Sequence, residues 1–316
     1  MGRSPRLILF ALSLALAACA EGTAGSAGGE RTGSDASASS AFPVTVDAGN
    51  GAVTVARRPE RIVSLSPTAT EMLFAIGAGD QVVAVDDQSN FPTEAPTTDL
   101  SGYEPNAESI ASYEPDLVVY ANDLGDVASA LDRLGIAALL EPAAPNLRTV
   151  YAQIEQLGAV TGRADGAHAV VSTMRSRISR IVASTPKPAE PLTYYHELDD
   201  TYYSVTSSTF IGRIYALLGL RNVADAVDAD GSDYPQLSPE YIIEANPDLI
   251  FLADTRCCAQ TAATVATRPG WDEIAAVRHG DVVELDDDIA SRWGPRIVDL
   301  VRAVARAVGG VETKAA

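Results

Sequence analysis

Two segments of the chain match each other without a gap, and one long helical stretch separates them. Residues 106–120 and residues 238–252 each begin with a helix-capping residue, carry Glu two positions later, and continue through Pro-Asp-Leu into an apolar run. Each pattern predicts a short capped helix, a break at Pro-Asp and a buried β-strand. A duplicated α/β unit explains a match of this length better than chance does. The sequence therefore predicts two similar α/β halves.

The stretch between the two segments, residues 163–184, has apolar residues at the i, i+3, i+4, i+7 spacing of an amphipathic helix. Gly162 precedes it, and the prolines that follow Thr185 end it. At about 1.5 Å per residue, roughly 20 residues form a rod about 30 Å long. Periodicity alone is equally typical of an ordinary core helix. Its place between two similar segments predicts that it joins two lobes.

The remaining chain alternates strand and helix patterns, which is typical of an α/β fold. In the first half, Thr68 and Glu71 have capping-box spacing after the buried strand 62–65 and predict a helix start. In the second half, residues 192–198 and 202–206 read as strands. The predicted regions are a lipoprotein signal peptide (1–18), a flexible tether (19–41), an N-terminal α/β lobe (42–145), a packing helix with the long linker helix (146–184) and a C-terminal α/β lobe (185–316).

The first 18 residues have the pattern of a targeting segment. Arg3 and Arg6 precede an apolar run that is too short to span a bilayer. The following Leu-Ala-Ala-Cys, ending at Cys19, looks like a bacterial lipobox, in which the Cys thiol is joined to diacylglycerol and becomes the mature N-terminus. The alternative is a plain secretory signal with an incidental Cys. Residues 20–41 are rich in Gly, Ser and Ala, as in a flexible tether with a reach of about 25 Å.

The chain is strongly acidic. Its formal net charge is −19, and removal of Arg3 and Arg6 with the first 18 residues makes it −21. This charge argues against nucleic acid and against an anionic membrane surface as partners.

Four stretches together resemble the substrate-binding proteins of ABC importers for iron complexes and cobalamin. They are residues 58–67, the two matching segments, residues 234–238 and residues 293–296. The resemblance runs from about residue 57 to the end. It implies a class III periplasmic binding protein fold, with two α/β lobes, one linker helix, an interlobe cleft and little hinge closure. It also implies a periplasmic or cell-surface protein that delivers its ligand to a permease dimer with ATPase subunits. We further expect a monomer without a cofactor, which the lipid on Cys19 anchors to the cell membrane.

Glu108 and Glu240 occupy equivalent positions at the starts of the two short predicted helices. A carboxylate there is stabilised by the helix dipole, which by itself is a sufficient reason for the residue. By resemblance, the pair matches the glutamates, one per lobe, that meet arginines on the two permease subunits. Like charges on two similar lobes suit a partner with two-fold symmetry.

Open α/β sheets place ligands at the carboxyl ends of their strands, which defines the expected cleft. Aromatic side chains there suit a large planar ligand, although any one of them could instead be a core or rim residue. By resemblance, Gln88, Tyr103, Tyr234 and Arg292 lie near positions that contact corrinoid in cobalamin binders. Two of those positions are Trp in such a binder and Tyr here. The full set of expected cleft residues is Ser66, Gln88, Phe91, Tyr103, His196, Tyr234, Arg292 and Trp293.

Cys257 and Cys258 follow the predicted strand 249–253, so they too are expected to face the cleft. Adjacent cysteines outside the cytoplasm could form a vicinal disulfide, bind a soft metal or remain thiols. The chain contains three histidines, which argues against a His-rich zinc or manganese site, and no metal site is predicted.

The favoured ligand is a metal chelate of the corrinoid class, such as cobalamin, because aromatics outnumber firm arginine candidates in the expected cleft. Ferric siderophores, which are often anionic, usually require several arginines; a siderophore or haem is the alternative ligand within the same importer class. A chelatase-like enzyme would need a general base, and His196 with Glu197 is the one tempting pair. A ligand sensor without transport remains a third alternative.

Overall fold

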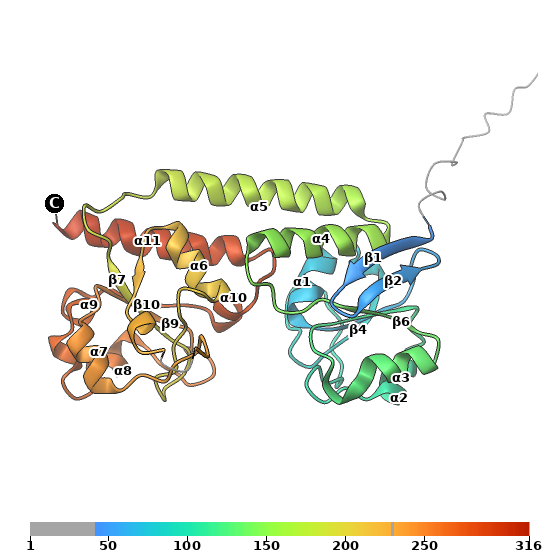
Figure 1. The fold of residues 1–316 in the computed structure, drawn as a ribbon, viewed down its shortest axis with the longest axis horizontal. Helices are drawn as coiled ribbons and strands as arrows, with labels where there is room; N and C mark the ends of the chain where they lie inside the picture. The colour runs from blue at the N-terminus through green and yellow to red at the C-terminus, as the bar shows by residue number, and fades with distance from the viewer. Residues whose placement is uncertain (1–41, 229–230, 316) are drawn as a thin grey trace, which may run out of the picture. The chain divides into compact units, whose positions relative to one another are not determined.

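The protein is described by a computed structural model that covers residues 42–228 and 231–315 (Figure 1). The described residues contain two four-stranded parallel sheets, and both sheets have the same strand order. Numbered within each half, that order is second, first, third, fourth. The first sheet contains β3 (Ile62–Leu65), β4 (Val82–Val85), β5 (Leu117–Tyr120) and β6 (Ala137–Leu140), and the second contains β7 (Thr193–Glu197), β8 (Arg221–Asn222), β9 (Leu249–Leu252) and β10 (Val282–Glu284). The predicted fold class is confirmed.

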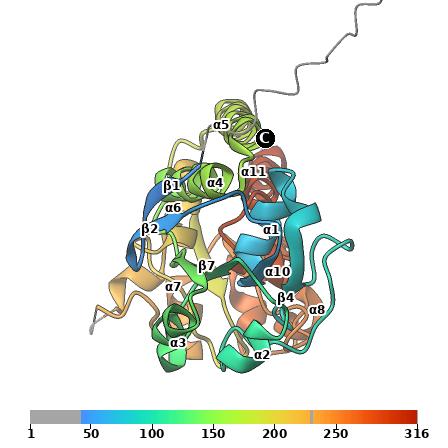
Figure 2. The same ribbon diagram turned by 90° about the vertical axis from the view of Figure 1, so that its right-hand side faces the viewer.

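Helices cover both sheets. The first half has α1 (Pro67–Ala75), α2 (Ala107–Ala111), α3 (Val127–Arg133) and α4 (Leu147–Thr161), and the second has α6 (Phe210–Leu217), α7 (Pro239–Ala245), α8 (Ala262–Ala266), α9 (Ala275–His279) and α10 (Asp287–Ser291). An antiparallel hairpin, β1 (Val44–Ala48) with β2 (Gly51–Val55), packs beside α4 (Figure 2).

The two matching segments have the same structural role in their halves. Each forms a short helix, α2 or α7, that is capped by the side chain of Asn106 or Ser238. The Asp after each Pro then holds the start of the first strand of its sheet. Asp116 accepts a hydrogen bond from the backbone N of Arg61 at 3.0 Å, and Asp248 accepts one from the backbone N of Thr193 at 2.8 Å. The sequence match thus reflects two equivalent anchoring points.

Two long helices, α5 (Ala164–Ser184) and α11 (Ile297–Ala315), lie side by side (Figure 1). The buried face of α5 is formed by Ala167, Val171, Met174 and Ile178, which is the predicted apolar stripe. It packs against α4 and α11. These residues belong to a continuous apolar core that also includes side chains of β3, β5, β7 and β9.

Two local predictions are wrong. Residues 202–206 are not a strand, because Tyr203 makes only an isolated bridge to Gln236. The N-cap of α1 is Ser66 rather than Thr68, and its side chain accepts a hydrogen bond from the backbone N of Ala69. Glu71 therefore takes no part in the cap. Its carboxylate binds Arg292 and Arg296.

The predicted signal peptide, Cys19 and the tether lie outside the described residues. Within the described ranges, no helix has both the length and the apolar character needed to cross a membrane.

Candidate ligand-binding site

A pocket of about 260 Å³ lies at the carboxyl ends of β3, β4 and β5. Three chain segments that directly follow these strands supply its wall, namely residues 65–68, 86–88 and 121–122. The opposite side is formed by residues 288–293, at the end of α10 and in the segment that leads to α11. The pocket is thus formed by both halves of the molecule, at the sheet edge where parallel α/β folds bind ligands.

Five of the eight expected cleft residues line this pocket. They differ in exposure: Ser66 is 3% exposed, whereas Tyr103 is 70% exposed. Trp293 lines the pocket and also packs against the main apolar core. The five residues are Ser66, Gln88, Tyr103, Arg292 and Trp293.

His196 does not line the pocket, which corrects the sequence-based expectation. Its side chain is fully buried, with Nδ1 2.8 Å from the Tyr215 hydroxyl, and burial lowers its pKa to about 3. Neighbouring residues of a strand point to opposite faces of the sheet, so Glu197 lies on the other face. There it binds both terminal nitrogens of Arg268 at 2.6 Å. Strand geometry therefore separates His196 from Glu197, the pair that a chelatase would use as acid and base.

Phe91 and Tyr234 are exposed but do not line this pocket. The Phe91 ring lies under the Arg296 guanidinium, 4.2 Å from its carbon. Tyr234 is 50% exposed and lies in the loop before α7. Both remain candidates for contact with a ligand that extends beyond the pocket.

Cys257 and Cys258 form a vicinal disulfide in the loop after β9. The carboxylate of Asp287 binds this loop by accepting hydrogen bonds from the backbone N of Arg256 and Cys257 at about 3 Å. The two cysteines do not line the pocket. Of the three forms left open by the sequence, the disulfide is the one present.

Arg292 is the cation of the pocket wall, and acceptors already surround its guanidinium. Its Nη1 lies 3.1 Å from Glu71 Oε1 and 2.9 Å from Asn90 Oδ1. Its Nη2 lies 2.7 Å from Asp288 Oδ1 and 3.0 Å from the carbonyl O of Gln88. Two carboxylates thus balance one guanidinium that is only 10% exposed.

Glu71 is the buried centre of this network, with a side chain 1% exposed. It also binds Arg296, whose Nε lies 2.9 Å from Oε2. Because Glu71 belongs to α1 and both arginines follow α10, the network connects the two halves beside the pocket. Sequence reasoning missed it, since the pairs are separated by more than 200 residues.

Asp86, Asn122 and Asp288 also line the pocket and were not predicted from the sequence. Asp86 and Asn122 come within two residues of the ends of β4 and β5. The rule that ligands meet the carboxyl ends of parallel strands could have identified both.

Glu108 and Glu240 are exposed in the first turns of α2 and α7. Neither forms an ion pair with a residue that the structure describes. Both therefore remain available to an external partner.

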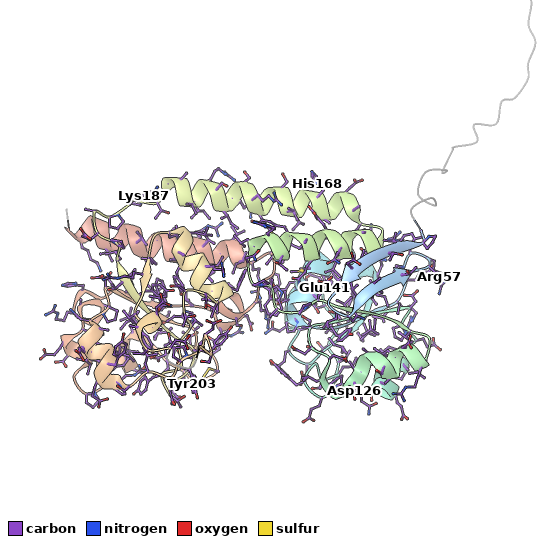
Figure 3. All side chains as sticks on the ribbon, in the orientation of Figure 1. Arg57, Asp126, Glu141, His168, Lys187 and Tyr203 are labelled. Atoms are coloured by element: carbon purple, nitrogen blue, oxygen red, sulfur yellow. A yellow bond between two sulfur atoms is a disulfide. The ribbon has the colours of Figure 1, made fainter. Side chains whose placement is uncertain are left out.

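The histidines lie apart on three elements: His168 on α5 (Figure 3), His196 on β7 and His279 on α9. Among the described residues, no group of three or more His, Cys, Asp or Glu side chains could hold a metal ion.

Comparison with known proteins identifies the type of protein. A model of the periplasmic binding protein family matches residues 62–289. The chain belongs to this family. It is a binding protein rather than an enzyme, and it works outside the cytoplasm with a small-molecule ligand and a permease partner.

Two curated relatives cover most of the chain. An uncharacterized ABC transporter substrate-binding lipoprotein of Bacillus subtilis is 33% identical over 277 residues, which are 84% of this chain and 86% of the relative. A cobalamin-binding protein of Halobacterium salinarum is 32% identical over 316 residues, which are 97% of this chain and 84% of the relative. The predicted membership of the ABC importer binding proteins is thereby confirmed.

Solved structures share the fold of this binding protein. The periplasmic vitamin B12 binding protein of Vibrio cholerae has a TM-score of 0.67 and 25% identity, covering 80% of this chain and 98% of that chain. The apo periplasmic haem-binding protein of Roseiflexus has a TM-score of 0.70 and 23% identity, covering 80% and 99%. Proteins named for different ligands thus share this architecture, so the ligand has to be argued from the pocket.

Proposed function

We propose that this binding protein captures a corrinoid, with cobalamin as the favoured ligand, and delivers it to an ABC importer. The main support for this proposal is that Arg292 already forms ion pairs within the protein. The pocket cation is already paired with Glu71 and Asp288, at 3.1 and 2.7 Å. It has little capacity left for an anionic ligand.

The charges of the pocket favour a ligand that is neutral at its edge. The pocket lining contains two acidic side chains, Asp86 and Asp288, and one basic side chain, Arg292. The pocket wall therefore carries no excess of positive charge. Haem propionates and siderophore carboxylates are usually held by arginines that are free to form paired hydrogen bonds. Cobalamin is neutral overall, and its corrin rim carries amide groups that hydrogen-bond without requiring a counter-charge.

The size of the pocket agrees with partial enclosure of a large ligand. Its volume of about 260 Å³ is below the roughly 300–1,000 Å³ typical of pockets that enclose a drug-sized molecule. It would hold one edge of a corrin ring. The exposed rings of Tyr103 and Tyr234, one in each half, would then be available to contact the remaining surface. The name of the Halobacterium relative supports the same ligand class.

The ligand class can be tested by visible absorption. The purified full chain is incubated in turn with cyanocobalamin, haemin, ferrichrome and a carboxylate-type ferric siderophore, and then separated from free ligand. Stoichiometric co-elution with cyanocobalamin is expected. Co-elution with haemin or a ferric siderophore, and none with cyanocobalamin, would refute the corrinoid proposal while leaving the importer class intact.

The location of the site can be tested with Trp293→Ala. Loss of a buried aromatic contact should weaken cyanocobalamin binding by about 1–3 kcal/mol. Tyr203→Ala is the matched control, because Tyr203 is exposed in the second half (Figure 3) but does not line the pocket. Equal affinity of Trp293→Ala and wild type would exclude Trp293 from the site.

We also propose that Glu108 and Glu240 dock the permease and that a lipid on Cys19 anchors the protein to the membrane. The equivalent, exposed positions of the two glutamates support the first proposal. The Leu-Ala-Ala-Cys sequence supports the second, together with the lipoprotein name of the Bacillus relative.

A further inference from the structure

Asp86 occupies an unusual position in the pocket wall. It directly follows β4, and its backbone N donates to the carbonyl O of Ser64 at 2.9 Å. The next residue, Asp87, donates its backbone N to the carbonyl O of Leu100 at 2.7 Å. The backbone on both sides of the Asp86 carboxyl is therefore fixed by neighbouring chain segments.

The carboxyl group of Asp86 is buried yet incompletely hydrogen-bonded. The residue is 4% exposed, and its Oδ1 has no hydrogen-bond partner in the described part of the chain. A buried polar atom without a partner costs about 1–3 kcal/mol. Such an atom in the wall of a ligand pocket suggests that the partner is supplied by the ligand.

Gly102 leaves room for the carboxyl group of Asp86. A Cβ atom at position 102 would lie 2.6 Å from Asp86 Oδ2 and 3.0 Å from the carbonyl O of Leu65. Any larger residue would push the carboxyl group aside. Asp86 and Gly102 both line the pocket, so the missing side chain of Gly102 keeps the carboxyl within the pocket wall.

The electrostatic surroundings agree with a role in ligand recognition. Burial is the main reason that the pKa of Asp86 is raised to about 6, and the charge of Asp87 adds to it, whereas Ser89 and Arg292 oppose it. Arg292 itself is already balanced by Glu71 and Asp288. Arg292 is therefore a nearby cation, but it is already paired and donates no hydrogen bond to Asp86 Oδ1.

We propose that Asp86 is a specificity-determining ligand contact, which accepts a hydrogen bond from a primary amide at the edge of the bound ligand and rejects a carboxylate at the same place. This proposal rests on the proposed corrinoid function. A ligand carboxylate at this point would face Asp86 without a free counter-charge, and juxtaposed like charges are strongly disfavoured. An amide supplies the N–H donor that the buried oxygen lacks.

The test compares cyanocobalamin with its monocarboxylic acids, in which one peripheral amide has been hydrolysed. The full-length wild-type chain should bind at least one of these acids at least about tenfold more weakly than cyanocobalamin at pH 8. Asp86→Asn should reduce that ratio to less than about threefold, because the amide of Asn can donate to a carboxylate. Asp86→Ala provides a second variant and should reduce the ratio in the same way. Asp87→Asn, at the exposed neighbouring position, should leave it unchanged.

The outcomes separate the two proposals. If wild type binds cyanocobalamin and the Asp86 variants keep the full discrimination against every acid, the role of Asp86 is refuted and the corrinoid function stands. Equal binding of all the acids by wild type would refute the role of Asp86 in the same way. If wild type does not bind cyanocobalamin, both proposals fail.

Discussion

Glu71 and Arg292 form a buried ion pair, with Oε1 3.1 Å from Nη1, that connects α1 to the end of α10. Arg292 also lines the pocket, and Arg296 binds the same carboxylate. One buried acid thus fixes two arginines from the other half of the molecule. This arrangement both sets the charge of the pocket and holds its two sides together.

Glu71→Gln should therefore be strongly destabilising. It leaves Arg292 and Arg296 with a neutral amide in place of a buried carboxylate, and removal of one partner from a buried pair typically costs about 3–5 kcal/mol. Urea unfolding of the full chain measures the change. The control is Asp80→Asn, which removes an exposed pair with Arg163 and should cost less than about 1 kcal/mol. Similar losses in both variants would contradict the structural role of Glu71.

The sequence predicted the repeated architecture well, for a physical reason. The capped helix, the Pro-Asp break and the apolar strand are all determined by neighbouring residues, so residues 106–120 and 238–252 carry their own structural signal. The pocket position followed from the same logic, because strand ends can be located in an alternating βα sequence. Ser66 and Gln88, which follow β3 and β4, were predicted in this way and line the pocket.

Tertiary contacts explain what the sequence did not reveal. Glu71 had the spacing of a capping box, but Ser66 caps the helix and Glu71 turns to arginines that lie more than 200 residues away. His196 was expected in the cleft because it lies near the carboxyl end of a predicted strand, yet β7 places it on the face covered by Tyr215. The period of a strand shows that neighbouring side chains point to opposite faces of the sheet. It does not show which face borders the ligand.

Glu141 should make stability depend on pH. It follows β6 in the first half (Figure 3), is 5% exposed, and its Oε1 has no hydrogen-bond partner among the described residues. Burial raises its pKa from 4.5 to about 8, opposed by Gln153. Because the folded protein holds this proton more tightly than the unfolded chain, the resulting stability is complete below about pH 4.5 and is lost as pH rises through about 8.

Glu141→Gln should abolish this dependence. Relative to the variant, wild type should lose about 2–4 kcal/mol of unfolding free energy between pH 5 and pH 9, since each pKa unit corresponds to about 1.4 kcal/mol. Denaturant unfolding at several pH values provides the measurement. Glu155→Gln, at an exposed position of α4, is the control and should follow the wild-type profile. A constant difference between Glu141→Gln and wild type across this range would show that Glu141 does not titrate as described.

Reversal of either proposed docking charge should impair transport without affecting ligand capture. Glu108→Lys and Glu240→Lys would place a positive charge against the expected permease arginines, at a cost of several kcal/mol in a desolvated contact. Cyanocobalamin affinity should stay within about twofold of wild type, because neither residue lines the pocket. Uptake and ATPase stimulation with reconstituted permease should fall at least about tenfold.

Glu244→Lys is the matched control for docking, because Glu244 is exposed on the same helix as Glu240. It should transport normally. Full transport by Glu108→Lys and Glu240→Lys, or loss of ligand binding in either, would refute the docking role.

Cys19→Ala should release the protein from the membrane fraction, because the variant cannot receive the diacylglycerol. Cell fractionation with immunodetection distinguishes the two outcomes, and metabolic labelling with a fatty acid confirms the modification directly. Cys257→Ser should remain in the membrane fraction, since that cysteine belongs to the disulfide and not to the lipobox. A membrane-associated Cys19→Ala variant would refute the anchor.

Binding of a neutral corrinoid can be measured by calorimetric titration of the purified full chain with cyanocobalamin, followed by haemin as a competitor. We expect saturable binding of one cyanocobalamin per chain that excess haemin does not displace, because the paired Arg292 gives haem propionates no free cation. Absence of heat and of saturation with cyanocobalamin, or its displacement by equimolar haemin, would contradict the claim that this pocket is built for a neutral corrinoid.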